Sequence, residues 1–60
     1  MKRVEIWVVE FVRKDGKPYK RREFDCFAYG NRPHATDRRT LLEQMNPVQK
    51  TRAVPFVETR

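Results

Sequence analysis

The residue types that carry most enzyme chemistry are scarce in this chain of 60 residues. It contains one cysteine, Cys26, and one histidine, His34. Nucleophilic catalysis requires a nucleophile held beside a base, with a third group that orients the base. We expect Cys26 to lie on the core side of a strand and His34 to lie in an exposed loop after Pro33. The sequence therefore predicts no catalytic Cys–His pair.

Metal and phosphate-loop chemistry are also poorly represented. A structural zinc site takes four Cys or His ligands, which a single Cys and a single His do not supply. The two glycines, Gly16 and Gly30, stand alone, so they do not form a glycine-rich phosphate loop. Glu23 and Asp25 alternate along one predicted strand, and we expect both to point outward to basic neighbours. We predict that the protein is not an enzyme and has no catalytic residue, cofactor, metal or small-molecule substrate.

The pattern that does point to a function is a local cluster of positive charge. Residues 13–22 contain six of the 14 Lys and Arg residues and one acid, Asp15, so they account for +5 of the net charge of +6. Such a patch attracts polyanions. An alternative is that these side chains only protect an exposed strand from unwanted pairing. The predicted electrostatic contacts are Arg13, Lys14, Lys17, Lys20, Arg21 and Arg22.

A β-hairpin over residues 3–29 is the element expected to present this charge. Residues 4–12 are rich in β-branched and aromatic residues, which favours a strand, and Asp15-Gly16 is a strong hairpin signal. A type I turn with Gly16 in the left-handed region would place Phe11 opposite Tyr19. A tight two-residue turn is the alternative, and it would shift the register by one and exchange the faces.

A helix and a third strand complete the predicted fold. Thr36 or Asp37 can cap a helix over residues 36–46, and Asn46-Pro47 ends it. A strand over residues 52–59 should lie at a sheet edge, because Pro55 has no N–H to donate. We predict an α+β fold in β-β-α-β order, as a single small domain over residues 1–60. Its three-stranded sheet would carry one helix on one face.

The pairing of the third strand stays open between the first and second strands, and a parallel crossover to the first is preferred. We expect Leu41, Leu42 and Met45 to cover one sheet face. That face would carry Val4, Ile6, Val8, Phe24, Cys26 and Ala28. The opposite, uncovered face would carry Trp7, Val9, Phe11, Tyr19, Arg21 and Phe27.

An uncovered apolar face marks an interaction site. Trp7, Phe11 and Tyr19 are its predicted anchors, since aromatic residues dominate binding energies. Arg38 and Arg39 oppose the helix dipole, which suggests that they too serve an external partner.

Three functions follow from these features. The leading hypothesis is a small basic protein-binding module that meets an acidic surface of a larger protein and modulates or inhibits host transcription or nucleic-acid machinery. Its short length, taken as that of a complete gene product, favours a phage or mobile-element origin. The alternative is direct DNA or RNA binding through the basic hairpin and the aromatic sheet face. A second alternative is a structural homodimer, which sedimentation at micromolar concentration would test.

The expected location is the cytoplasm, that of the host if a phage encodes the protein. A single cysteine fits a reducing compartment, and the sequence contains no apolar run long enough to span a membrane.

Overall fold

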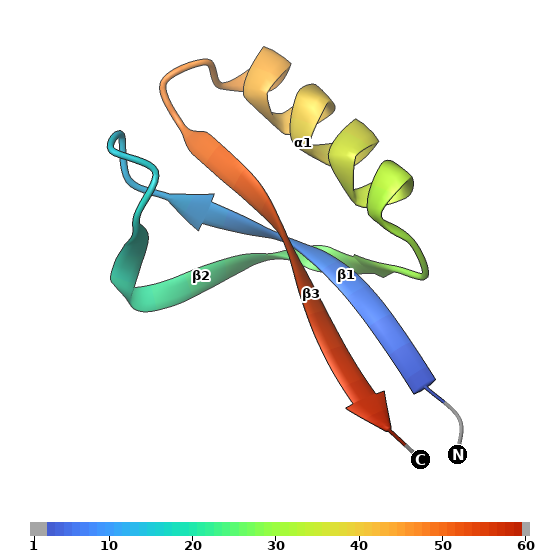
Figure 1. Cartoon of the computed structure of the whole chain (residues 1–60). Coiled ribbons are helices and arrows are strands. Elements are labelled where there is room, and N and C mark those ends of the chain that lie inside the picture. The colour runs from blue at the N-terminus through green and yellow to red at the C-terminus, as the bar shows by residue number, and fades with distance from the viewer. Residues whose placement is uncertain (1–2, 60) are drawn as a thin grey trace.

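The computed structural model describes residues 3–59, and its elements follow the predicted β-β-α-β order (Figure 1). The elements are β1 (Arg3–Val12), β2 (Pro18–Tyr29), α1 (Arg32–Met45) and β3 (Lys50–Thr59). The three strands form one sheet, and the helix lies on one side of it. The α+β fold class is therefore confirmed. Residues 1, 2 and 60 of the predicted domain lie outside the described residues.

The central strand of the sheet is β1, because the strand order is β2-β1-β3. The β1–β3 ladder is antiparallel and unbroken from Arg3↔Thr59 to Val12↔Lys50. The preferred pairing of the third strand with the first is therefore confirmed, although the two strands run antiparallel rather than parallel. Helix α1 carries the chain across β1 from one sheet edge to the other. This crossover makes β3 parallel to β2, and both are antiparallel to the central strand β1. Pro55 lies on an edge strand, as predicted, where a missing N–H is tolerated.

The turn of the hairpin matches the prediction, but the pairing beyond it does not. Gly16 has a φ of 84°, its N–H donates to the Arg13 carbonyl at 2.9 Å, and the Arg13 N–H donates to the Lys17 carbonyl at 2.9 Å. Phe11, however, pairs with Glu23 rather than Tyr19.

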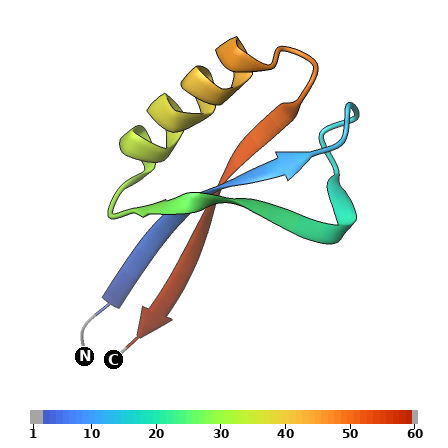
Figure 2. The same ribbon diagram turned by 180° about the vertical axis from the view of Figure 1, so that it is seen from behind.

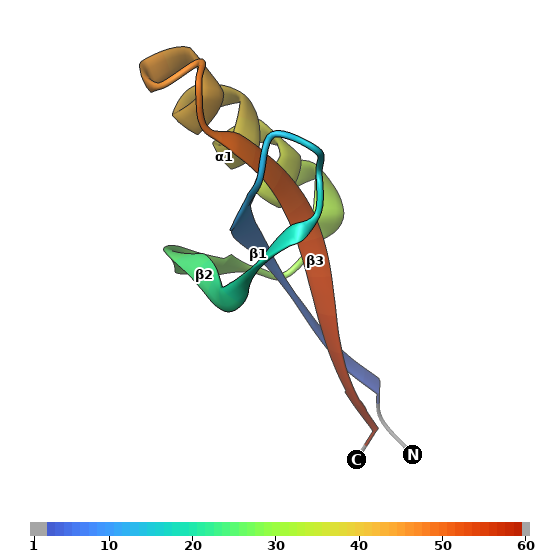
Figure 3. The same cartoon turned by 90° about the vertical axis from the view of Figure 1, so that its left-hand side faces the viewer.

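A bulge in β2 beside the hairpin turn causes this difference. Val12 pairs with Pro18 and Phe11 with Glu23, so residues 19–22 are extra residues on the β2 side of the ladder. A second irregularity separates the pairs Glu10↔Phe24 and Val8↔Ala28. Bulges bend a strand and increase its twist, and β2 is sharply bent beside the hairpin turn (Figures 1 and 3).

The helix covers the sheet face opposite to the one predicted. Arg39 of α1 donates to Thr51, and Arg32 lies over the Trp7 ring, 5.8 Å from its centroid. Thr51 pairs directly with Phe11, and directly paired residues point to the same face. Trp7, Val9 and Phe11 therefore lie on the helix side. Both faces of β1 are apolar, so alternation alone did not distinguish them.

Helix α1 begins four residues earlier than predicted. Asn31 is its N-cap and accepts a hydrogen bond from the His34 N–H at 3.1 Å. Pro33 lies in the first turn, where its fixed φ favours a helix and its missing N–H costs nothing. The C-terminal end at Asn46, before Pro47, is confirmed.

The residues through which α1 packs on the sheet, its docking stripe, also differ from the prediction. Ala35 is fully buried, whereas Leu41 and Met45, expected in the core, are 46% and 73% exposed. The inward positions are Ala35, Arg38, Arg39 and Leu42, so the helix docks partly through arginines. Arg38 donates to Asp25 at 2.8 Å. Arg38 and Arg39 therefore make contacts within the fold, instead of the contacts with an external partner that the sequence suggested.

The core is small and the molecule elongated, 41 Å along its longest axis. Val9, Val12 and Ala35 are the buried apolar residues within 3–59, and Glu10 and Thr51 are the buried polar ones. Beyond the last β1–β2 pair, the start of β1 and the end of β3 continue as a two-stranded arm (Figures 1 and 2). Among the described residues, no helix is both long enough and apolar enough to cross a membrane.

Candidate functional site

A fully buried carboxylate lies on the sheet face away from the helix. Glu10 is 0% exposed, and Arg22 and Arg52 both point at it. Arg22 donates from Nε to Oε2 and from Nη2 to Oε1, each at 3.0 Å. Arg52 donates from Nε to Oε1 at 2.9 Å, and its Nη2 lies 2.8 Å from the same oxygen. We call Arg22 and Arg52, held by Glu10, the arginine clamp.

The strand arrangement explains how the clamp forms. Arg52 is the direct β3 partner of Glu10, while Phe24 is its β2 partner. Arg22 lies in the extra segment of β2, whose bend brings it back over the carboxylate. Both arginine side chains remain exposed, at 44% and 43%, and cover Glu10 from solvent.

The electrostatics of the clamp follow from these contacts. The hydrogen bond from Arg22 lowers the pKa of Glu10 below its usual 4.5, burial opposes this, and the hydrogen bond from Arg52 adds to it. The same contact raises the pKa of Arg22. Glu10, with its lowered pKa, is ionised at neutral pH, and arginine side chains stay protonated in proteins. The clamp therefore carries a net positive charge on an exposed surface.

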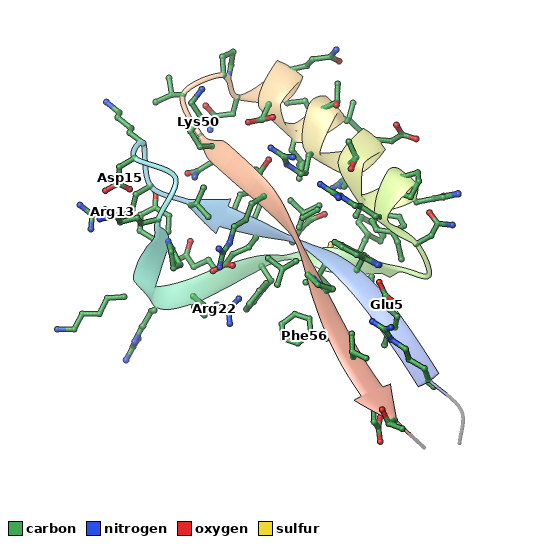
Figure 4. The ribbon with its side chains drawn as sticks, in the orientation of Figure 1. Glu5, Arg13, Asp15, Arg22, Lys50 and Phe56 are labelled. Atoms are coloured by element: carbon green, nitrogen blue, oxygen red, sulfur yellow. The ribbon has the colours of Figure 1, made fainter. Side chains whose placement is uncertain are left out.

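Two phenylalanines adjoin the clamp. The Arg22 guanidinium lies over the Phe24 ring at 4.9 Å, and Phe24 contacts Phe56 edge-on, with ring centroids 5.8 Å apart. Their exposed fractions are 40% and 46%, and Ile6, the β1 partner of Phe56, is 43% exposed. Arg22 and Phe56 lie on the side of the sheet away from the helix (Figure 4). We call this surface the open face; its residues are Ile6, Val8, Phe24, Val54 and Phe56.

The sequence predicted one uncovered apolar sheet face, and the structure has such a face. Its residues, however, differ from the predicted ones. Trp7 and Phe11 are partly buried on the helix side. Trp7 donates from Nε1 to Glu5 and packs against Arg32. The structure thus separates Trp7 and Phe11 from the open face.

The predicted basic contacts gather at the hairpin end of the molecule. Arg13 lies 3.8 Å from Asp15, and Arg22 belongs to the clamp. Within residues 3–59, six exposed cations make no ion pair. Two of them are Arg32 and Lys50, and the other four lie in the hairpin; these are Lys14, Lys17, Lys20 and Arg21. We call them the hairpin cations.

Tyr19 lies with this charge. It is 36% exposed, and it lines a surface depression of about 380 Å³ with Arg13, Lys14 and Asp15. Lys50 pairs with Val12 at the root of the hairpin and adds a further positive charge (Figure 4).

Several contributors were missed from the sequence, namely Glu10, Arg52, Phe24 and Phe56. Glu10 offered one signal, because it is an acid between Val9 and Phe11 in the most apolar part of the strand. Its partners were not predictable, since the bulges of β2 decide which arginine reaches it.

The residues considered for catalysis do not come together. Cys26, expected on the core side, is exposed. His34 is exposed, but lies in α1 rather than in a loop, with its ring 6.4 Å from that of Tyr29. No group of three or more His, Cys, Asp or Glu side chains in the described part of the chain could hold a metal ion.

Comparisons with protein-family models, curated proteins and solved structures found no match.

Proposed function

We propose that this protein is a non-enzymatic nucleic-acid-binding module whose basic hairpin contacts phosphates. The observation that carries the proposal is the set of hairpin cations, which are exposed and without ion pairs beside the net-positive arginine clamp. Exposed cations without an ion pair can each replace a counterion on a phosphate backbone. The single cysteine fits a reducing compartment, so we place this binding in the cytoplasm.

The structure also changes the relative support for the two leading hypotheses. Protein binding ranked first because Trp7 and Phe11 were expected as large anchors on the uncovered face. Both are partly buried beneath the helix. The aromatic residues left on the open face, Phe24 and Phe56, lie directly beside arginines, a combination that suits stacked bases and phosphates.

Neutralising the hairpin lysines tests the proposal. We expect the triple variant K14Q/K17Q/K20Q to bind a fluorescent oligothymidylate at least tenfold more weakly. The slope of log affinity against log salt should fall by about 2, since each phosphate contact on a single strand contributes about 0.7. Fluorescence anisotropy over a salt series measures both quantities.

The control removes charge at the other end of β1. Arg3 is exposed and lies in the two-stranded arm, far from the hairpin (Figure 1), so R3Q should change affinity much less than the triple variant. Binding that is unaffected by salt, or a triple variant that binds as tightly as the wild type, would contradict the proposal.

A protein partner is the second candidate, and a different surface favours it. Leu41, Met45 and Val48 are 46%, 73% and 70% exposed, and they recur at helical spacing along the outer side of α1 and past its end. Such a patch fits an apolar site on a larger protein, such as a component of the host transcription or nucleic-acid machinery if a phage encodes this chain. A pull-down from lysate with and without nuclease separates the candidates. A discrete protein band that survives nuclease and is lost in L41D/M45D would favour this second function.

A further inference from the structure

We infer that the arginine clamp and the Phe24–Phe56 pair form a one-nucleotide subsite for single-stranded nucleic acid. In this subsite the clamp holds a phosphate and the phenylalanine pair stacks a base. The inference rests on the proposed function and goes further, because it assigns a second site, on the sheet, and selects single strands over duplex.

The clamp retains the donors that a phosphate needs. Each guanidinium has five N–H donors, and both direct only Nε and Nη2 at Glu10. The two N–H groups on each Nη1 are therefore not used by the carboxylate. The Nη2 atoms of Arg22 and Arg52 lie within 3.0 Å of the same Glu10 oxygen, so the two guanidiniums are close neighbours, and a single phosphate can contact both.

Glu10 makes the clamp a preorganised site rather than two mobile side chains. Arginine loses side-chain entropy when a ligand fixes it, but here the buried carboxylate already fixes both guanidiniums. An apolar residue at position 10 would fill the same space without the cost of burying a charge. The presence of Glu10 is explained if the orientation of the arginines matters, since Arg is selected where bidentate phosphate recognition is needed.

The phenylalanine pair supplies the selectivity for single strands. Phe24 and Phe56 are 40% and 46% exposed, and Arg22 over the Phe24 ring links them to the phosphate position. Bases stack on aromatic side chains without sequence preference, but only when they are not stacked within a duplex. From this subsite, the sugar–phosphate backbone of the bound strand can continue toward the hairpin end, where the hairpin cations lie. The open face is thus matched in charge and chemistry to a single strand.

Replacing the clamp arginines by lysine tests the phosphate part. R22K/R52K keeps the net charge at +6 but loses the planar, bidentate donors. We expect about a tenfold loss of affinity for oligothymidylate. The matched control is R3K, because Arg3 is an exposed arginine of the two-stranded arm, outside both the clamp and the hairpin cations, and it should bind like the wild type. Equal affinity of R22K/R52K and R3K overturns the clamp assignment.

For a second variant, E10L, the inference predicts a change in affinity opposite to the change expected from net charge alone. E10L removes an acid and raises the net charge, which alone should strengthen binding; the inference predicts weaker binding instead, because the guanidiniums lose their fixed orientation. E23Q, an exposed acid on β2, raises the charge equally and should bind as tightly as the wild type or more tightly. Circular dichroism establishes that each variant is folded. Tighter binding by a folded E10L overturns the inference; if E10L does not fold, the R22K/R52K comparison decides.

The base-stacking part is tested with F24L/F56L, which keeps the surface apolar. We expect about a tenfold loss on oligothymidylate and no change on an abasic strand of equal length. The wild type should prefer oligothymidylate to its duplex with oligodeoxyadenylate, and F24L/F56L should lose that preference. Equal losses on the thymine and abasic strands, or a wild-type preference for duplex, contradict the assignment.

If K14Q/K17Q/K20Q weakens binding while the clamp and phenylalanine variants do not, only this inference fails. If no variant and no salt change matters, the proposed function fails with it.

Discussion

Replacing Arg22 and Arg52 together by methionine is expected to remove most of the stability of the domain at neutral pH. The methionine side chains keep an apolar cover over Glu10, which is 0% exposed, but they leave its carboxylate without partners. A buried charge that loses its partners costs about 3–5 kcal/mol. A domain of 60 residues is stable by only about 3–9 kcal/mol, so the melting temperature should fall by 10 °C or more.

The pH dependence of stability should reverse in the same variant. In the wild type, the lowered pKa of Glu10 adds stability that is present above the unfolded value of 4.5 and is lost as pH falls through the folded pKa. In R22M/R52M, burial without partners raises the pKa of Glu10. Protonation then relieves the buried charge, so the variant should become more stable as pH falls toward 4.5. The wild type should keep the contribution of Glu10 down to about 4.5 and lose it below that pH.

The control is the variant E10L/R22M/R52M, which replaces the whole cluster by apolar residues. Such replacements of buried ion pairs are often neutral or stabilising, so this variant should recover the lost stability and show little pH dependence from this site. Thermal unfolding followed by circular dichroism between pH 3 and pH 7 measures all three proteins. A stable R22M/R52M at neutral pH would contradict the buried position of Glu10.

A large effect is also expected where the helix docks. Ala35 is 0% exposed, so A35D places an unpaired carboxylate between α1 and the sheet and should cost about 3 kcal/mol or more. L41D introduces the same residue into the same helix, with a similar loss of helix propensity. Because Leu41 is 46% exposed, L41D should cost only about 1 kcal/mol.

Comparing A35D with L41D tests whether α1 packs through the residues seen in the structure or through those that the sequence suggests. Leu41 is the more hydrophobic residue, and a stripe of Leu41, Leu42 and Met45 would make L41D the more damaging change. Urea unfolding of the two variants gives the comparison directly. A larger loss in L41D than in A35D would mean that α1 packs through its other side.

The elements of the fold could be predicted from local signals. The Asp15-Gly16 turn, the stop at Asn46-Pro47 and the edge position forced by Pro55 each depend on backbone chemistry at one place in the chain. The start of α1 was misjudged because Pro33 acts equally as a loop residue and as a first-turn residue. Only the cap at Asn31, with its hydrogen bond to the His34 N–H, distinguishes the two.

The faces of the sheet could not be predicted in this way. The bulges in β2 shift the register by an even number of residues, since Phe11 pairs with Glu23 rather than Tyr19, so they leave each residue on the same side of the sheet as its predicted neighbours. The error lies in the side assigned to the helix, because β1 is apolar on both sides and its alternation does not indicate which side α1 covers. As a result, Trp7 was assigned to the open face and Phe24 to the covered one, although the structure places each on the other side.

The candidate site was predictable in its charge but not in its geometry. Residues 13–22 revealed the hairpin cations, because charge clustering is visible in sequence. Glu10 and Arg52 are 42 positions apart, and only the antiparallel β1–β3 register brings them together. Arg22 was predicted as a contact for a partner, yet its role as half of the arginine clamp depends on the bend in β2.

The most direct test of the central claim is to titrate isotope-labelled protein with oligothymidylate and map the amide chemical-shift changes by nuclear magnetic resonance. We expect the changes to fall on the hairpin and the open face, including Lys20, Phe24 and Phe56, and to spare the outer side of α1 at Leu41 and Met45. Absence of any change, or changes confined to the outer side of α1, would contradict binding of nucleic acid through the sheet.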